Sequence, residues 1–231
     1  MRYLIRTLCL LCGVVFCVEV LKLPAEARVI YRCASGDGRK RIALTFDDGP
    51  HPKYTPQILD VLAEYGVPAT FFVVGTNAEN YPQLIRRIHL EGHEIGNHTF
   101  HHYHMSKMNA EELKNDVVSC RDTVEALTGV APTLFRPPEG VCTDAVREIC
   151  RELGMTIIIW SVDTKDWAHP KQQEILDNVR ANSTDGAIIL MHDFIGQKSP
   201  TPQALKKMIP MLRELGYEFV TVSQLLRGGK A

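Results

Sequence analysis

The chain has 231 residues, of which 45% are hydrophobic and 23% are charged; this composition is typical of one globular domain and not of a disordered chain. The formal net charge is −1, so the sequence lacks the basic surplus of a nucleic-acid-binding protein. We therefore expect one domain with at most a short appendage and no nucleic-acid partner.

The first 27 residues have the pattern of an export signal. Arg2 and Arg6 precede an almost uncharged run, and the segment ends in the sequence AEA. A basic start, a short apolar core and an A-x-A site are typical of a secretory signal peptide, and the apolar run is shorter than the ~20 residues of a membrane span. We expect cleavage after Ala27, with retention as an N-terminal anchor as the alternative. Residues 28–40 would be a linker or N-terminal extension, and residues 41–231 the main domain.

Four cysteines follow this segment: Cys33, Cys120, Cys142 and Cys150. They have no C-x-x-C spacing, so we do not expect a cluster of thiolate ligands. Export would allow a disulfide between Cys142 and Cys150, which flank one predicted helix. Buried free thiols are the alternative.

From residue 41 the chain alternates short apolar runs with longer amphipathic segments. We predict strands at 42–46, 69–74, 94–96, 133–136, 156–162, 187–191 and 219–222. We predict helices over 55–65, 77–90, 110–127, 143–153, 172–182 and 202–215, and a last turn at 223–226. Such alternation implies a mainly parallel sheet with helices outside. About 190 residues are few for a complete (β/α)8 barrel of about 250, so we expect a distorted, incomplete (β/α) barrel of about seven or eight parallel strands.

Chemically reactive side chains follow directly after these predicted strands. They are Asp47, Asp48, His98, Arg136, Asp163, Asp166 and His192. In parallel α/β folds the carboxyl ends of the strands carry the active site. The sequence therefore predicts one site at that edge of the sheet.

Some of these residues could bind a metal ion. Five histidines lie between residues 93 and 104, and two of them, His98 and His102, have the i, i+4 spacing that would place both on one face of a helical turn. With Asp48 they make a two-histidine, one-carboxylate set that leaves positions open for water and substrate. These ligands fit one divalent ion, Zn²⁺ in the first place, with Co²⁺, Ni²⁺ or Fe²⁺ as alternatives. A histidine-rich solvent-exposed loop without a metal is the other interpretation.

Five short motifs, in order, resemble those of the polysaccharide deacetylases, the carbohydrate esterases of family four that share the chitooligosaccharide deacetylase homology domain. They are TFDDGP at 45–50, HTFHH at 98–102, RPPEG at 136–140, DTKDW at 163–167 and LMH at 190–192. The resemblance covers about residues 41–226. It implies that residues 41–231 are the catalytic domain of a metal-dependent hydrolase that removes N-acetyl groups from amino-sugar polymers.

The resemblance also implies roles for the first motifs. Asp47 would be the general base that takes a proton from the attacking water. Arg136 would pair with Asp47 and keep it ionised and oriented. Asp48, His98 and His102 would bind the metal, with the neighbouring histidines outside the site.

In the later motifs, His192 would be the general acid that protonates the departing amine, and Asp166 would raise its pKa by attraction. Trp167 and Leu190 would wall the pocket that receives the acetyl methyl group. One position departs from the family, which usually has an aromatic residue, most often Tyr, where this chain has Glu139. That position supplies a backbone N–H to the oxyanion hole, which any non-proline residue can donate. We therefore expect Glu139 to alter the substrate preference and not the reaction.

Peptidoglycan is the first candidate substrate, because an exported catalytic domain meets the cell wall, and chitin-like GlcNAc chains are the second. The alternatives are an O-acetyl polysaccharide esterase and a non-catalytic wall-binding relative. An Fe(II) oxygenase is disfavoured because its carboxylate follows closely after its first histidine, whereas Asp48 precedes His98 by 50 residues. We expect a secreted or cell-envelope monomer that meets a membrane only through a retained N-terminal segment.

Overall fold

The computed structural model of the protein describes residues 27–193 and 198–228, apart from the side chain of Ser106. The expected leader, except for Ala27, lies outside these residues and stays a prediction. Within the described ranges, no helix is long and apolar enough to cross a membrane.

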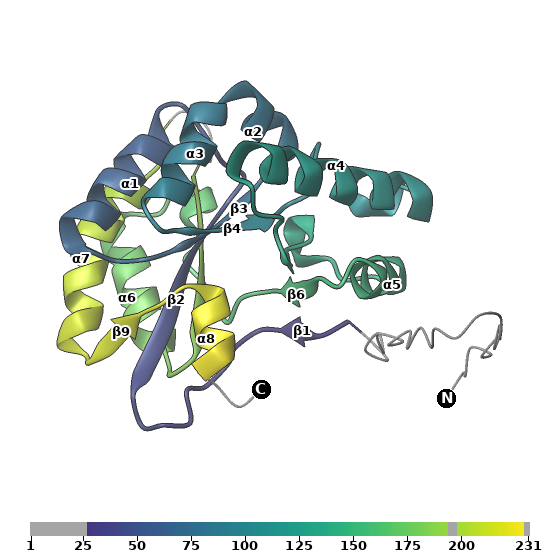
Figure 1. The fold of residues 1–231 in the computed structure, drawn as a ribbon. Helices are drawn as coiled ribbons and strands as arrows, with labels where there is room; N and C mark the ends of the chain where they lie inside the picture. Colours follow the sequence, from purple (N-terminus) through teal and green to yellow (C-terminus); the bar gives the residue numbers. More distant parts are fainter. Residues whose placement is uncertain (1–26, 194–197, 229–231) are drawn as a thin grey trace, which may run out of the picture.

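A strongly curved parallel sheet forms the centre of the described domain, and helices cover its outside (Figure 1). Eight strands follow one path in the order β1-β6-β5-β4-β3-β2-β8-β7, and β9 pairs with β2. The strands are β1 Val29–Ile30, β2 Lys40–Asp47, β3 Thr70–Val73, β4 Glu94–Asn97, β5 Leu134–Phe135, β6 Thr156–Ile158, β7 Val162–Asp163, β8 Ala187–His192 and β9 Tyr217–Phe219. The path ends at β1 and β7, so the sheet is an open half-barrel. The predicted incomplete (β/α) barrel is confirmed.

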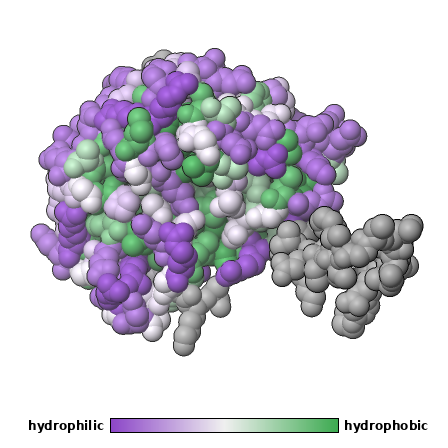
Figure 2. All heavy atoms as spheres, in the orientation of Figure 1, coloured by the Kyte–Doolittle hydropathy of each residue, from purple (hydrophilic) through white to green (hydrophobic). Residues whose placement is uncertain are grey.

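The helices pack against one another in two groups around this sheet. They are α1 Tyr54–Tyr65, α2 Gly75–Asn80, α3 Pro82–Leu90, α4 Ala110–Thr128, α5 Asp144–Glu152, α6 Gln172–Asn182, α7 Thr201–Glu214 and α8 Val222–Gly228. In the first group α7 packs against α1 and α6, and in the second α4 packs against α2, α3 and α5 (Figure 1). On the face drawn in Figure 2, hydrophobic residues lie in small groups between hydrophilic ones.

Strand β2 is the centre of the sheet. Its residues are buried except for Lys40, and Ile42, Leu44 and Phe46 belong to the largest hydrophobic cluster. A strand that is covered on both faces needs such a nearly continuous apolar sequence. Asp47 at its carboxyl end is the direct partner of His192 on β8. Residues in register on neighbouring parallel strands point to the same side of the sheet, so the strand pairing alone brings these two side chains together.

The structure corrects three predicted elements. The helix expected over 77–90 is two helices, and Pro82 begins the second because a proline lacks the N–H that a helix interior needs. The strand expected over 156–162 is interrupted between β6 and β7. The last strand ends at Phe219, and α8 begins at Val222. Strand β1 lies within the segment 28–40 and joins it to the sheet through β6.

The described cysteines, Cys33, Cys120, Cys142 and Cys150, are free thiols. The structure therefore contains free thiols, which we gave as the alternative to a disulfide between Cys142 and Cys150. Burial raises the pKa of the Cys120 and Cys150 thiols to about 12, so neither has the thiolate character of a reactive cysteine.

Candidate active site

A cavity of about 330 Å³ opens at the carboxyl ends of the strands. Its walls contain nine residues from the five sequence motifs or next to them, together with Trp160. The lining residues are Asp47, Asp48, His98, His102, Glu139, Trp160, Asp163, Trp167, Leu190 and His192. Motifs that are up to 145 residues apart in the chain, from Asp47 to His192, therefore share one cavity.

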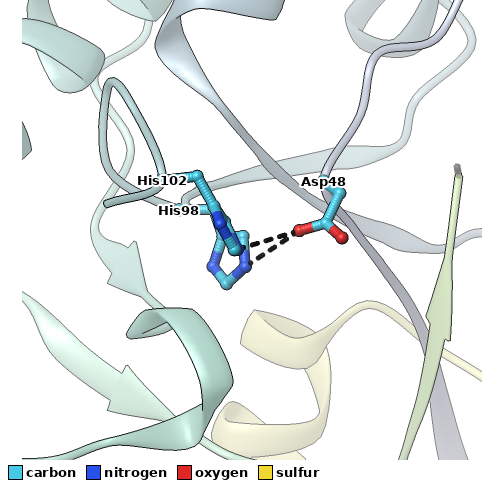
Figure 3. Close-up of side chains that lie close together, drawn as sticks. All are labelled: Asp48, His98 and His102. Atoms are coloured by element: carbon cyan, nitrogen blue, oxygen red, sulfur yellow. Dashed lines mark ion pairs between the residues drawn. The ribbon is translucent and has the colours of Figure 1, made fainter. Parts of the chain in front are cut away.

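Asp48, His98 and His102 line this cavity with their ligand atoms within 4.8 Å of one another. The Oδ1 atom of Asp48 is 3.4 Å from Nε2 of His98 and 3.1 Å from Nε2 of His102, as the dashed lines in Figure 3 indicate. Burial raises the pKa of Asp48, but its contacts with both histidines outweigh this and hold the pKa well below its usual range. This carboxylate stays ionised at any pH at which the protein would work.

The two histidines do not meet on a helical turn, as the spacing had led us to expect. They follow β4 in an irregular loop in which Thr99 and His102 have positive φ angles of 68° and 57°. The Asn97 side chain anchors this loop: it accepts from the Thr99 N–H at 2.9 Å and donates to the Val117 carbonyl at 2.8 Å. The loop turns His102 back over His98, with ring centroids 4.9 Å apart.

The orientation of His98 leaves one ring nitrogen available for a ligand. Its Nδ1 atom lies 2.7 Å from the backbone carbonyl oxygen of Arg136, which can only accept a hydrogen bond. The Nδ1 atom therefore donates to this carbonyl, and the other ring nitrogen, Nε2, faces Asp48. Metal-binding histidines are commonly oriented in this way.

Asp47 is held by a buried ion pair. Its Oδ1 atom is 2.6 Å from Nη1 of Arg136, a side chain with no exposed surface. Arg136 also donates to the carbonyls of Ile158 and Ile159 and to the Thr45 hydroxyl. Burial lowers the pKa of Arg136, and Asp47 opposes that shift. An arginine remains charged under these conditions, so it keeps a positive charge beside the Asp47 carboxylate.

His192 forms a second ion pair at this site, with Asp166. Its Nδ1 is 2.7 Å from Oδ1 of Asp166, and Oδ2 of Asp166 accepts from the His192 N–H at 2.8 Å and from the Thr201 hydroxyl at 2.6 Å. Burial lowers the pKa of His192, but Asp166, together with the charges of Asp47 and Asp48, raises it to about 9. The imidazole is therefore cationic at neutral pH.

The sequence profile of the polysaccharide deacetylase family matches residues 34–158. This chain belongs to that family. The deacetylase is 44% identical over 193 residues to a peptidoglycan-N-acetylglucosamine deacetylase of Bacillus cereus, with 83% of this chain and 90% of the relative covered. It is 38% identical over 200 residues to a chitooligosaccharide deacetylase of a Bradyrhizobium species, with 81% and 91% covered. The solved structure of the Bc1960 peptidoglycan N-acetylglucosamine deacetylase matches with a TM-score of 0.82 at 38% identity, over 85% of this chain and 92% of that one.

Glu139 lies at the rim of the catalytic cavity of the deacetylase. Its φ of 58° and ψ of 10° place it in the left-handed region, and its Oε2 atom is 3.3 Å from Nε2 of His104. Next to it, Gly140 packs so closely on Trp160 that a Cβ atom there would lie 2.9 Å from the indole ring. Trp167 is 53% exposed, whereas Leu190 is 3% exposed, so the two line the outer and inner parts of the cavity.

The other histidines of the cluster have different neighbours. His101 pairs with Asp116 at 2.5 Å, and His104 contacts Glu139. His93 is buried and accepts from the Ala69 N–H at 3.2 Å. Among the described residues, only Asp48, His98 and His102 converge as a set of three metal-binding side chains.

Sequence reasoning missed two residues of this region, Trp160 and Asp193. Trp160 lies between β6 and β7, inside a run that had been assigned to one strand. Asp193 is fully buried directly after His192, accepts a hydrogen bond from the Thr55 hydroxyl, and has its pKa raised by burial to about 7. A Cβ atom on Gly49 would lie 2.3 Å from the Asp193 carboxylate. The adjacent aspartate in the sequence His192-Asp193 was the available signal.

Proposed function

We propose that this deacetylase hydrolyses the acetamido groups of N-acetylglucosamine residues in bacterial peptidoglycan. The observation that carries the proposal is the arrangement within one cavity: the Asp48, His98 and His102 set shares it with the Asp47–Arg136 pair and the His192–Asp166 pair. A base, an acid and a site for an electrophilic carbonyl would then lie within one cavity. The substrate class is supported by the similarity to the Bacillus relative.

The three-residue donor set fits one divalent cation. Two imidazole nitrogens and a carboxylate oxygen converge, and His98 is already oriented by the Arg136 carbonyl. Such ligands suit Zn²⁺, and Co²⁺, Ni²⁺ or Fe²⁺ could be held by the same atoms. When bound, the cation would polarise the amide carbonyl and lower the pKa of the attacking water.

Asp47 would accept the proton of the attacking water. Its neighbour Asp48 is engaged by the two histidines, whereas Asp47 turns one oxygen to Arg136 and keeps Oδ2 3.8 Å from Nε2 of His98. Arg136 would fix the direction of the Asp47 carboxylate through the 2.6 Å ion pair, so the carboxylate is positioned to act as a base without reorganisation.

His192 would donate a proton to the departing amine nitrogen. A proton must be delivered there because an amide anion is a very poor leaving group, and Asp166 keeps the imidazole protonated for this purpose. The backbone N–H of Glu139 would meet the negative charge on the tetrahedral intermediate. Leu190 and Trp167 would surround the acetyl methyl group.

The preference for peptidoglycan also agrees with the expected export of the chain to the cell envelope. Chitin-like GlcNAc chains and O-acetylated polysaccharides could use the same groups, since both present an acetyl carbonyl next to a sugar ring. Neither contains the stem peptides of a cell wall, so the three classes can be compared directly.

The test is an incubation of the Zn²⁺-loaded protein with muropeptides, with chitin oligomers and with acetylxylan. We expect acetate release and the loss of one C₂H₂O unit per modified GlcNAc in the muropeptides, measured by mass spectrometry. The Asp47→Asn variant, which keeps the size of the side chain, should release almost none. A higher kcat/KM on chitin oligomers or acetylxylan would contradict the substrate assignment, and no acetate from any substrate would contradict the reaction.

A further inference from the structure

A second groove of about 600 Å³ lies beside the catalytic cavity, between the histidine loop and α4. It is lined by His101, Tyr103, His104, Lys107, Met108, Glu112, Asn115, Asp116 and Ser119. None of the catalytic roles above uses these residues. We propose that this groove is a subsite for the sugar residues that adjoin the one being deacetylated; this inference rests on the function proposed above.

The groove contains an exposed tyrosine ring that stacks on a histidine of the same groove. Tyr103 is 56% exposed, and its ring stacks on His101 with a centroid distance of 4.8 Å and an interplanar angle of 3°. A large ring that stays open to water is expected where a partner will cover it. The apolar C–H face of a pyranose ring is a suitable partner for such a flat surface.

Asp116 on α4 makes this platform rigid. One of its oxygens lies 2.5 Å from Nδ1 of His101, and the other accepts from the backbone N–H groups of Phe100 and His101 at 2.9 and 3.1 Å. Asp116 is itself buried. The Tyr103 ring is therefore positioned before any ligand arrives, which lowers the entropy cost of binding.

The two cavities meet at one pair of side chains. His104 lines the groove and contacts Glu139, which lines the catalytic cavity, at 3.3 Å. A chain with one residue in the catalytic cavity could therefore extend across this pair into the groove. Tyr103 lines the groove and is not among the residues that line the catalytic cavity, so we expect a chain of several sugars to contact it more fully than a short one.

The polar walls of the groove fit a neutral, hydroxyl-rich chain. Lys107 and Glu112 bring charges of opposite sign, and Asn115 and Ser119 offer uncharged donors and acceptors. A strongly charged ligand would be attracted by one of the two charges and repelled by the other. The hydroxyl and acetamido groups of a glycan backbone, which peptidoglycan and GlcNAc oligomers share, can hydrogen-bond to such side chains, and a sugar ring can stack on Tyr103.

The test compares substrates of different length in the Zn²⁺-loaded protein. The Tyr103→Ala variant should raise KM for a GlcNAc hexamer about tenfold, the value expected for losing the burial of one ring face, with a much smaller effect on the dimer. The Tyr103→Phe variant keeps the ring and should retain most of the affinity. The Tyr31→Ala variant is the control, because Tyr31 is equally exposed at 54% and adjoins Arg32, which pairs with the start of β8, far from His192.

Calorimetric titration of the hexamer into the Asp47→Asn variant, with and without Tyr103→Ala, separates binding from turnover. Weaker binding after Tyr103→Ala supports the subsite even if acetate release fails, in which case only the proposed reaction is wrong. An equal loss of affinity for dimer and hexamer would overturn the subsite. So would an effect of Tyr103→Ala that is seen only with stem peptides attached, because the groove would then bind peptide.

Discussion

The pairing of His192 with Asp166 leads to a specific kinetic prediction. In the Asp166→Asn variant the amide can still accept hydrogen bonds from the His192 N–H and the Thr201 hydroxyl, but its NH₂ group would then face Nδ1 of His192. The variant would lose the attraction of Asp166, which contributes most to raising the pKa of His192 to about 9, while the burial that lowers it and the charges of Asp47 and Asp48 would remain. One adjacent opposite charge typically shifts a pKa by about 1–3 units, and each unit corresponds to about 1.4 kcal/mol between the two protonation states.

The pH dependence of kcat/KM on a soluble acetamide measures this change. A less stabilised imidazolium loses its proton sooner, so the alkaline limb should move to lower pH by about 1–3 units in Asp166→Asn. A cation bound by Asp48, His98 and His102 would repel the His192 imidazolium in the unchanged protein and in the variant alike. The quantity to compare is therefore the difference in the pH of the alkaline limb between the two proteins. The Thr201→Val variant is the control, because it removes one hydrogen bond to Asp166 and keeps the carboxylate.

The His192→Ala variant provides the second half of this test. It should slow amide hydrolysis about 10²–10⁴-fold but slow an acetate ester less, because an alkoxide leaves with less help from a proton. The general-acid role would be refuted if both substrates slowed equally and the alkaline limb of Asp166→Asn stayed in place. His192 would then position the substrate, and another proton donor would be needed.

The other predictions concern the metal ligands, the thiols and the cavity rim. His102→Ala should lose bound metal by elemental analysis, whereas His101→Ala should keep one equivalent, because His101 faces Asp116. Replacing Cys120 or Cys150 by serine should leave kcat nearly unchanged. Either substitution places a hydroxyl in a buried site and should lower the free energy of unfolding by about 1–3 kcal/mol. A large loss of kcat at unchanged stability would show a catalytic thiol. Glu139→Tyr should keep metal content and kcat on a small acetamide and change the preference among polymers; loss of turnover on every substrate would mean that the Glu139 carboxylate takes part in the chemistry.

The sequence predicted the sheet well because its strands are buried. Strand β8 is apolar up to Met191 and β2 is almost continuously apolar from Ile42 to Phe46, and the polar residues that come next, Asp47 and His192, end these two parallel strands. Periodicity could not find the break at Pro82, where a helical pattern continues across two helices, or the interruption around Trp160, where the apolar run does not reveal a change of direction.

The metal-binding set was predicted in its members but not in its geometry. The i, i+4 spacing of His98 and His102 suggested a helix, whereas the loop depends on positive φ angles at Thr99 and His102 and on the Asn97 side chain. Residues other than glycine seldom adopt such angles, and local sequence gives little sign of them. Asp193 was not predicted for another reason: its burial depends on tertiary packing, which the local sequence does not show.

The direct pairing of Asp47 with His192 across β2 and β8 determines which changes the domain can tolerate. The backbone distance between Asp47 and His192 is fixed by the hydrogen bonds between β2 and β8. It does not depend on the loops that connect the strands. One residue inserted into β8 would turn the His192 side chain to the opposite face of the sheet. Loops around the cavity that carry none of the metal-binding or acid–base residues can lengthen, shorten or be exchanged without that penalty. Engineering the deacetylase for other sugars should therefore succeed by replacement of such loops and fail by any insertion within these two strands.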